Sequence, residues 1–247
     1  MSNGPLRKAL AIIVGAGPGT GAAVGRAFSK KGYAVALLAR SKGKLNELSQ
    51  QIRSEGGTVE SFPCDVVSED SVKSAFNDIK KKFPGYLLRV AVFNSSGAFH
   101  LKPFLESKRT DLESGLNVSV LGAFSFAQAS LAELLSHDKG GSLIFTGATA
   151  SLRGGANLGC FAAGKFGLRA LSQSLAREFG PKGVHVAHVI VDGMIDGPTV
   201  TERFGPAKNP DSRLSPDSIA AAYVYLHEQD KTCWTQELDV RPCHEKF

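Results

Sequence analysis

The chain has 247 residues, of which 43% are hydrophobic and 21% charged, as expected for a folded globular protein with one sizeable core. The formal net charge is +6, but basic and acidic residues are mixed along the chain, which disfavours a nucleic-acid-binding protein. No apolar run is long enough to cross a bilayer and no secretory signal is recognisable, so we expect neither a membrane protein nor a secreted one.

Hydrophobic periodicity predicts short strands that alternate with helices along the chain. The strands are expected at residues 9–14, 33–39, 58–62, 87–93, 143–146, 184–191 and 234–240. The helices are expected at residues 22–31, 45–55, 69–82, 109–136, 157–179 and 215–226. Because the central strands are apolar on both faces, the pattern indicates a single α/β domain over residues 1–247. Its core is a doubly wound, Rossmann-type parallel sheet of about seven strands with helices on both faces.

A glycine-rich turn joins the first strand to the first helix. Residues without side chains let the backbone approach a pyrophosphate, and the N–H groups at the start of a helix favour its negative charge. We therefore predict that this turn binds the diphosphate of a dinucleotide. The predicted contacts are Gly15, Gly17, Pro18, Gly19, Thr20 and Gly21.

The end of the second strand indicates which dinucleotide is bound. An NAD-binding protein usually carries an acidic residue here, which hydrogen-bonds the ribose 2′-hydroxyl. This chain instead has Arg40, with Lys42 and Lys44 nearby and no carboxylate. A guanidinium suits a 2′-phosphate, so we predict NADP(H) rather than NAD(H) as the cofactor. The alternative is a surface arginine at a strand end.

Further motifs follow the third and fourth strands and lie in the two longest predicted helices. They are Asp65-Val66, Asn94-Ser95-Ser96-Gly97, Asn117 and Lys165. With the glycines, they make the chain resemble the short-chain dehydrogenase/reductase family over nearly its full length. The resemblance implies that Asp65 and Val66 contact the adenine, and that Asn94, Ser95 and Gly97 belong to the cofactor site. It also implies that Asn117 holds a water and that Lys165 binds the nicotinamide ribose.

The proton chemistry departs from the family pattern. The family's catalytic tyrosine lies four residues before the lysine, and this chain has Phe161 there. The position of the family's serine corresponds best to Ala148. Phenylalanine has no ionisable proton, and a positioned general acid is typically worth ~10²–10⁴ in rate. Two of the four expected catalytic side chains are therefore missing, while Asn117 and Lys165 remain.

Three side chains are candidates to replace the lost groups. Thr149 is next to the serine position, although one residue's shift on an extended segment points it the other way. Cys160 precedes Phe161 and reads as a small buried residue. Lys165, freed from a tyrosine partner, is the preferred proton donor, directly or through a water held by Asn117.

No metal site is expected, because His185 and His188 lie three residues apart on a strand and face opposite sides.

The loop after the sixth strand also departs from the family, which prefers Pro-Gly there. Ile195 is expected to pack near the nicotinamide. Asp192 and Asp196 are new carboxylates, which either meet a cationic substrate, act as a base, or are solvated loop acids. The irregular, polar segment at 196–214 is expected to form a substrate lid.

Three functions are consistent with these residues. The first is an NADP(H)-dependent oxidoreductase with an atypical proton donor, reducing a carbonyl, imine or enone. The second is a redox-inactive nucleotide-binding protein with a regulatory or scaffold role, and the third is a non-redox lyase or cyclase. The partner is expected to be a small-molecule substrate, and the family resemblance implies a homodimer or homotetramer. Four scattered cysteines predict reduced thiols and a cytoplasmic location.

Overall fold

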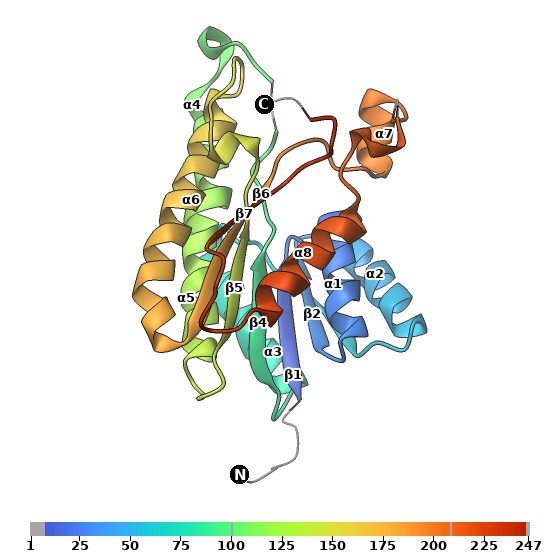
Figure 1. Ribbon diagram of the computed structural model, residues 1–247, viewed down its shortest axis with the longest axis vertical. Coiled ribbons are helices and arrows are strands. Elements are labelled where there is room, and N and C mark those ends of the chain that lie inside the picture. Colours follow the sequence, from blue (N-terminus) through green and yellow to red (C-terminus); the bar gives the residue numbers. More distant parts are fainter. Residues whose placement is uncertain (1–7, 100, 208, 246–247) are drawn as a thin grey trace.

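All seven predicted strands are present and form one parallel sheet, in the order β3-β2-β1-β4-β5-β6-β7 (Figure 1). The computed structural model describes residues 8–99, 101–207 and 209–245. The strands are β1 (Ala9–Val14), β2 (Ala34–Ala39), β3 (Val59–Pro63), β4 (Leu87–Phe93), β5 (Gly141–Thr146), β6 (Val184–Val191) and β7 (Glu237–Val240). The strand order reverses beside β1, where a doubly wound fold opens its ligand crevice.

Helices cover both faces of the sheet (Figure 1). They are α1 (Thr20–Lys30), α2 (Lys42–Ser54), α3 (Glu69–Lys82), α4 (Arg109–Leu116), α5 (Ala123–Leu134), α6 (Gly159–Phe179), α7 (Pro198–Phe204) and α8 (Pro216–Glu228). One buried cluster packs Phe28 of α1, Leu45 of α2 and Ile219 of α8 against the sheet. The other packs Phe76 of α3 and Phe126 of α5 against the opposite face, together with part of α6.

Three elements differ from their predicted form. The predicted long helix is divided by a π-helical turn at Asn117–Gly122. The lid contains α7, where Pro198 occupies the first turn and Gly205 follows the last residue with a φ of 77°. Strand β7 begins at Glu237 rather than at residue 234, because the ring of Trp234 stacks on His185, 4.8 Å between ring centroids.

The continuous helix over residues 109–134 is long and apolar enough, by length and composition, to cross a membrane. This differs from the prediction that no apolar run of the chain is long enough to cross a bilayer. Its apolar side chains serve the core, since Phe126, Leu131 and Leu134 are buried against the sheet and 44% of its most apolar window is buried. We therefore interpret it as a core helix.

Candidate active site

Two glycines fix the shape of the turn between β1 and α1. Gly15 has a φ of 79°, and a Cβ there would lie 2.6 Å from the backbone of Asn94 and Ser95. A Cβ at Gly21 would lie 2.5 Å from the carbonyl oxygen of Gly15. Both positions therefore require glycine, because β4 and α1 approach the turn so closely.

The middle of the same turn is open. A Cβ at Gly17 or Gly19 would meet no atom within 4 Å, so these residues border free space. Thr20, at the start of α1, is 6% exposed, and its hydroxyl has no hydrogen-bond partner among the described residues. A buried hydroxyl without a partner beside a helix N-terminus fits a ligand with phosphate oxygens. The cradle thus suits the predicted dinucleotide.

A cavity of about 290 Å³ extends from this turn over the ends of β2 and β3. Arg40 and Lys44 line it with exposed side chains, and Asp65, Val66 and Ser95 line it as well. The Asp65 carboxylate accepts a hydrogen bond from the Val67 N–H at 3.1 Å, which fixes its orientation. The predicted adenosine contacts therefore surround one space, with two cations at its rim.

A larger cavity of about 780 Å³ continues from the glycine turn toward the lid. It shares Gly15, Gly17, Asn94 and Ser96 with the first cavity. Its wall brings together the residues on which the chemistry depends, namely Ala148, Thr149, Phe161, Lys165 and Ile195. A dinucleotide lying along the turn would thus have one end beside Arg40 and the other beside Phe161.

Lys165 is the central ionisable group of the larger cavity. Its side chain is 3% exposed, and its Nζ donates a hydrogen bond to the Thr146 carbonyl at 2.9 Å. Burial lowers the pKa of this ammonium to about 8. The Nζ lies 5.8 Å from the ring centroid of Phe161, whose ring meets Phe99 edge-on at 5.2 Å. An ammonium thus stands where the family has a lysine–tyrosine pair.

A hydrogen-bonded group joins the ends of β4 and β5 to α8. The Thr146 hydroxyl donates to the Asn94 side-chain oxygen at 3.0 Å and lies 2.7 Å from the Tyr223 hydroxyl. Asn94 in turn donates to the Gly15 carbonyl at 3.0 Å. These hydrogen bonds fix the position of the Thr146 carbonyl, which Lys165 contacts, relative to the glycine turn.

Thr149 does not take the place of the missing serine. It begins a 3₁₀ turn (Thr149–Ser151), which brings its side chain into the cavity wall rather than away from it. Its hydroxyl donates to the carboxylate of Asp192. Because a hydroxyl has one proton, Thr149 is not a donor to a substrate carbonyl.

The two new carboxylates, for which three roles were left open, are both paired. Asp192 is 2% exposed, and besides Thr149 it meets Arg241, whose guanidinium lies 3.3 Å away. Asp196 is exposed and lies 3.4 Å from the guanidinium of Arg213. Asp192 is thus neither a free base nor a contact for a cationic substrate, and Asp196 is a lid residue in an ion pair.

The two ends of the segment at 196–214 are hydrogen-bonded to each other. Backbone hydrogen bonds join Leu214 to Met194 at 2.9 Å and Asp196 to Leu214 at 2.8 Å. Arg213, with a side chain only 7% exposed, donates to the Gly205 carbonyl at 2.6 Å. The predicted lid is therefore a loop with an anchored base, carrying α7 above the larger cavity.

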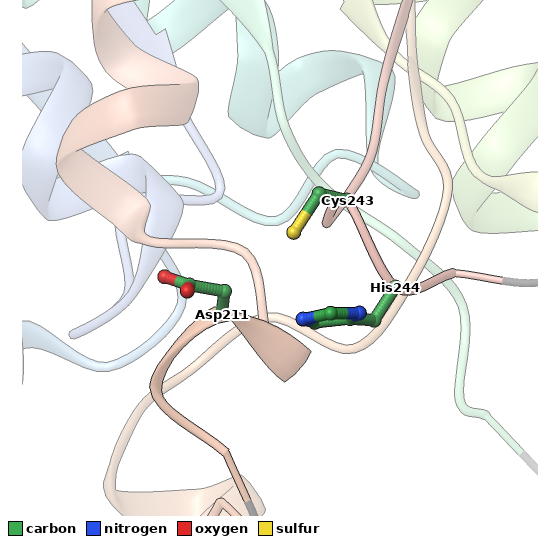
Figure 2. Close-up of side chains that lie close together, drawn as sticks. All are labelled: Asp211, Cys243 and His244. Atoms are coloured by element: carbon green, nitrogen blue, oxygen red, sulfur yellow. The ribbon is translucent and has the colours of Figure 1, made fainter.

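The lid also meets the C-terminal segment. Figure 2 shows the side chains of Asp211, Cys243 and His244 close together, and their potential ligand atoms lie within 4.8 Å of one another. The sequence does not reveal this cluster, because Asp211 lies about thirty residues before Cys243 and His244. All three side chains are exposed, so we interpret the cluster as the contact between the lid and the C-terminal segment.

Comparisons with known proteins agree with this geometry. Residues 9–207 match the family model for short chain dehydrogenases. A crystal structure of a short-chain dehydrogenase from Rhodopseudomonas palustris is 33% identical, with a TM-score of 0.81 and coverage of 96% of this chain and 99% of that one. This chain belongs to the short-chain dehydrogenase/reductase family.

Two further relatives are similar over most of their length. Carbonyl reductase family member 4 of Danio rerio is 29% identical over 188 residues, which is 75% of each chain. An alcohol dehydrogenase from the archaeon Thermococcus sibiricus, solved with 5-hydroxy-NADP, is 26% identical with a TM-score of 0.84. That likeness covers 97% of this chain and 98% of the archaeal one.

The predicted site residues of this family member do not all meet at the cavities. Asn117 is half-buried and is absent from the described residues that line either cavity. Ser119, two positions along the π-helical turn, is 2% exposed, and its Oγ lies 3.5 Å from the Gly97 N–H. Ser119 therefore contacts the segment after β4, and the water-holding role of Asn117 stays a prediction.

Two side chains behind the cavity wall were also missed. Ser151 accepts a hydrogen bond from the Ala148 N–H at 3.1 Å, and the Nε2 of His188 lies 3.2 Å from the same hydroxyl. Burial lowers the pKa of His188 to about 4, so its imidazole is neutral. His185 faces the other side of β6 and contacts the carbonyls of Leu226 and Thr235, as the strand period predicts.

Proposed function

We propose that this short-chain dehydrogenase binds NADP(H) and reduces a carbonyl, imine or enone substrate, with Lys165 as the source of the proton. The observation that carries the proposal is the buried Lys165 ammonium in the wall of a cavity continuous with the glycine turn. The NADP analogue in the archaeal alcohol dehydrogenase and the carbonyl reductase relative support the same cofactor and reaction class.

In this proposal, different residues bind different parts of the cofactor. Gly17, Gly19 and Thr20 receive the diphosphate, and Arg40 receives the 2′-phosphate. The adenine contacts Asp65 and Val66, and Asn94, Ser95, Gly97 and Ile195 complete the site. When bound, the nicotinamide supplies the hydride.

Lys165 has two roles in this proposal. Its ammonium has three protons to donate, of which one reaches the Thr146 carbonyl in the described structure. The others are free for the nicotinamide ribose and for the oxygen or nitrogen of a substrate. An amine with a pKa near 8 is a stronger acid than an ordinary lysine and donates a proton more readily near neutral pH.

We predict that the rate of NADPH-dependent reduction falls as pH rises through about 8. The ammonium is present below its pKa and is lost above it, so the proton donor disappears at alkaline pH. The kcat should be measured against pH, with the affinity for NADPH measured in parallel by fluorescence titration. A kcat that stays constant to pH 10 while NADPH remains bound would exclude Lys165 as the donor.

A second candidate function is a nucleotide-binding protein without redox turnover. Phe161, which lines the cavity without an ionisable group, favours it. The two functions differ in one measurement: both require NADPH binding, but only the first consumes NADPH when a panel of imines, enones, aldehydes and ketones is added.

We also propose that two copies of the chain pair through α5 and α6. Leu121 on the π-helical turn before α5, Phe124 on α5 and Phe166 on α6 are between 41% and 58% exposed, although such side chains are usually buried. We expect a dimer or tetramer in sedimentation experiments, and Phe124→Glu should shift it toward monomer. A wild type that is monomeric at micromolar concentration contradicts the pairing.

A cytoplasmic location is proposed as well, because all four cysteines are free thiols in the structure.

A further inference from the structure

The wall of the larger cavity combines large apolar side chains with positive charge. Its apolar part comes from the loop after β4, the start of α6, the loop after β6 and the lid. These residues are Phe99, Leu101, Leu158, Met194, Val200 and Phe204. Leu101 is 54% and Phe204 47% exposed, so the cavity presents apolar surface to a ligand.

All charged side chains in this wall, among the described residues, are positive. They are Arg153, Lys165 and Arg203. Asp192, the acid closest in sequence to the wall residue Gly193, is buried against Thr149 and Arg241 and does not line the cavity. The cavity therefore attracts anions, and no described carboxylate in its wall offsets that attraction.

Arg153 and Arg203 are available to a ligand. Both are exposed, and neither forms an ion pair with a described carboxylate, whereas Arg213 and Arg241 are paired with Asp196 and Asp192. Arg203 contacts only the ring of its neighbour Phe204 among the described charge and ring contacts, 5.2 Å from the centroid.

The proposed cofactor does not account for these two arginines. Its 2′-phosphate is assigned to Arg40 and its diphosphate to the turn at Gly17–Thr20, and neither group needs Arg153 or Arg203. Arg153 follows the turn after β5, and Arg203 lies on α7 of the lid, so the two guanidinium groups belong to the wall and the cover of the same cavity.

We infer that the substrate of this short-chain dehydrogenase is an amphipathic anion, an apolar carbonyl compound with a carboxylate or phosphate held by Arg153 and Arg203. This inference rests on the proposed reductase function and names its substrate class. A guanidinium binds either anion through two parallel hydrogen bonds, and an anion held by Arg203 also fixes the lid over the apolar body.

The test measures binding rather than turnover, so it does not depend on reductase activity. Titration calorimetry with the protein saturated with oxidised NADP⁺, which cannot donate a hydride, compares 4-oxononanoate with its methyl ester, which removes the charge and keeps the apolar body. We expect the acid to bind at least tenfold more tightly than the ester, with an advantage that shrinks as salt is raised. Equal affinities for the acid and the ester overturn the inference.

Variants locate the anion. Arg203→Gln and Arg153→Gln should each reduce the preference for the acid while leaving NADPH affinity unchanged, and the matched control Arg177→Gln, on the far end of α6, should change neither. A loss of NADPH affinity in Arg153→Gln or Arg203→Gln would assign these arginines to the cofactor and overturn the inference.

A further comparison with nonyl phosphate separates the two anions. Tighter binding than that of 4-oxononanoate assigns the arginines to a phosphate, and the reverse order assigns them to a carboxylate. NADPH oxidation with the neutral ketone 2-nonanone, together with equal binding of acid and ester, would support the reductase but not the anionic substrate. A preference for the acid without NADPH oxidation would support the anion site and count against the reductase.

Discussion

Replacing Phe161 with tyrosine and Ala148 with serine is expected to raise NADPH-dependent reduction of ketones and aldehydes at least ~10²-fold. The wild type should be slow with these substrates, because a ketone needs a better proton donor than an imine or enone does. The pair restores a phenol beside the Lys165 ammonium and a hydroxyl for the substrate oxygen. A gain of this size corresponds to roughly 3 kcal/mol of activation free energy.

The structure supports the pair because both positions face open space. Ala148 and Phe161 line the same cavity as Lys165, so the added hydroxyls enter open space rather than the packed core. The Ser151 hydroxyl already accepts a hydrogen bond from the Ala148 N–H, which fixes the backbone at that position. A buried hydroxyl left without a partner would cost about 1–3 kcal/mol, and this cavity avoids most of that cost.

The matched control is the same pair of substitutions in a Lys165→Met background. That triple variant keeps both hydroxyls and loses the ammonium, so it should lose most of the gain. NADPH absorbance should be followed against a panel of aldehydes and ketones after folding and NADPH binding are verified. A double variant that folds, binds NADPH and stays inactive across the panel would place the defect elsewhere, in the loop at 192–199, and would favour the non-redox functions.

Arg40→Asp is expected to reverse the cofactor preference from NADPH to NADH. The guanidinium of Arg40 is exposed at the rim of the smaller cavity, where it can bind a 2′-phosphate, whereas a carboxylate repels that phosphate and accepts a hydrogen bond from a 2′-hydroxyl. Hydrogen bonds to charged groups contribute roughly 1.5–3 kcal/mol, so NADPH affinity should fall roughly tenfold to a hundredfold.

Lys139→Asp is the control for Arg40→Asp. It makes the same change in net charge on the exposed turn before β5, far from the cavity, and should leave the preference unchanged. Titration calorimetry with both cofactors gives the ratio of NADPH affinity to NADH affinity for each protein. Equal affinities for NADPH and NADH in the wild type would show that Arg40 does not read the 2′ position.

The sequence predicted the fold well because strands and helices depend on local patterns. All seven strands and the parallel sheet were confirmed, and so was the family. The glycine turn and Lys165 could be placed because the strand and helices around them have clear hydrophobic periodicity. The start of β7 was wrong because Trp234 is held by a contact with His185 on another strand. Helix α7 was missed because its polar, short sequence carries little periodic signal.

The site was harder to predict because its side chains find partners far along the chain. The sequence left Asp192 open between a reactive carboxylate and a solvated loop acid, and neither describes it, because it is buried and paired with Arg241 from beyond β7. The orientation of Thr149 depended on a 3₁₀ turn that an extended reading of the segment excludes. The directions in which Asn117 and Ser119 project from the long helix depend on a π-helical turn. The hydrophobic pattern of the sequence does not predict that turn.

The burial of Lys165 also gives this side chain a reactivity that ordinary lysines lack. With a pKa of about 8, about a tenth of its amines are unprotonated at pH 7, far more than for a solvated lysine. An unprotonated amine in an apolar cavity is a nucleophile that condenses with an aldehyde to an imine and water. Trapping that imine with borohydride and mapping the labelled peptide would reveal which aldehydes enter the cavity, without any need for turnover.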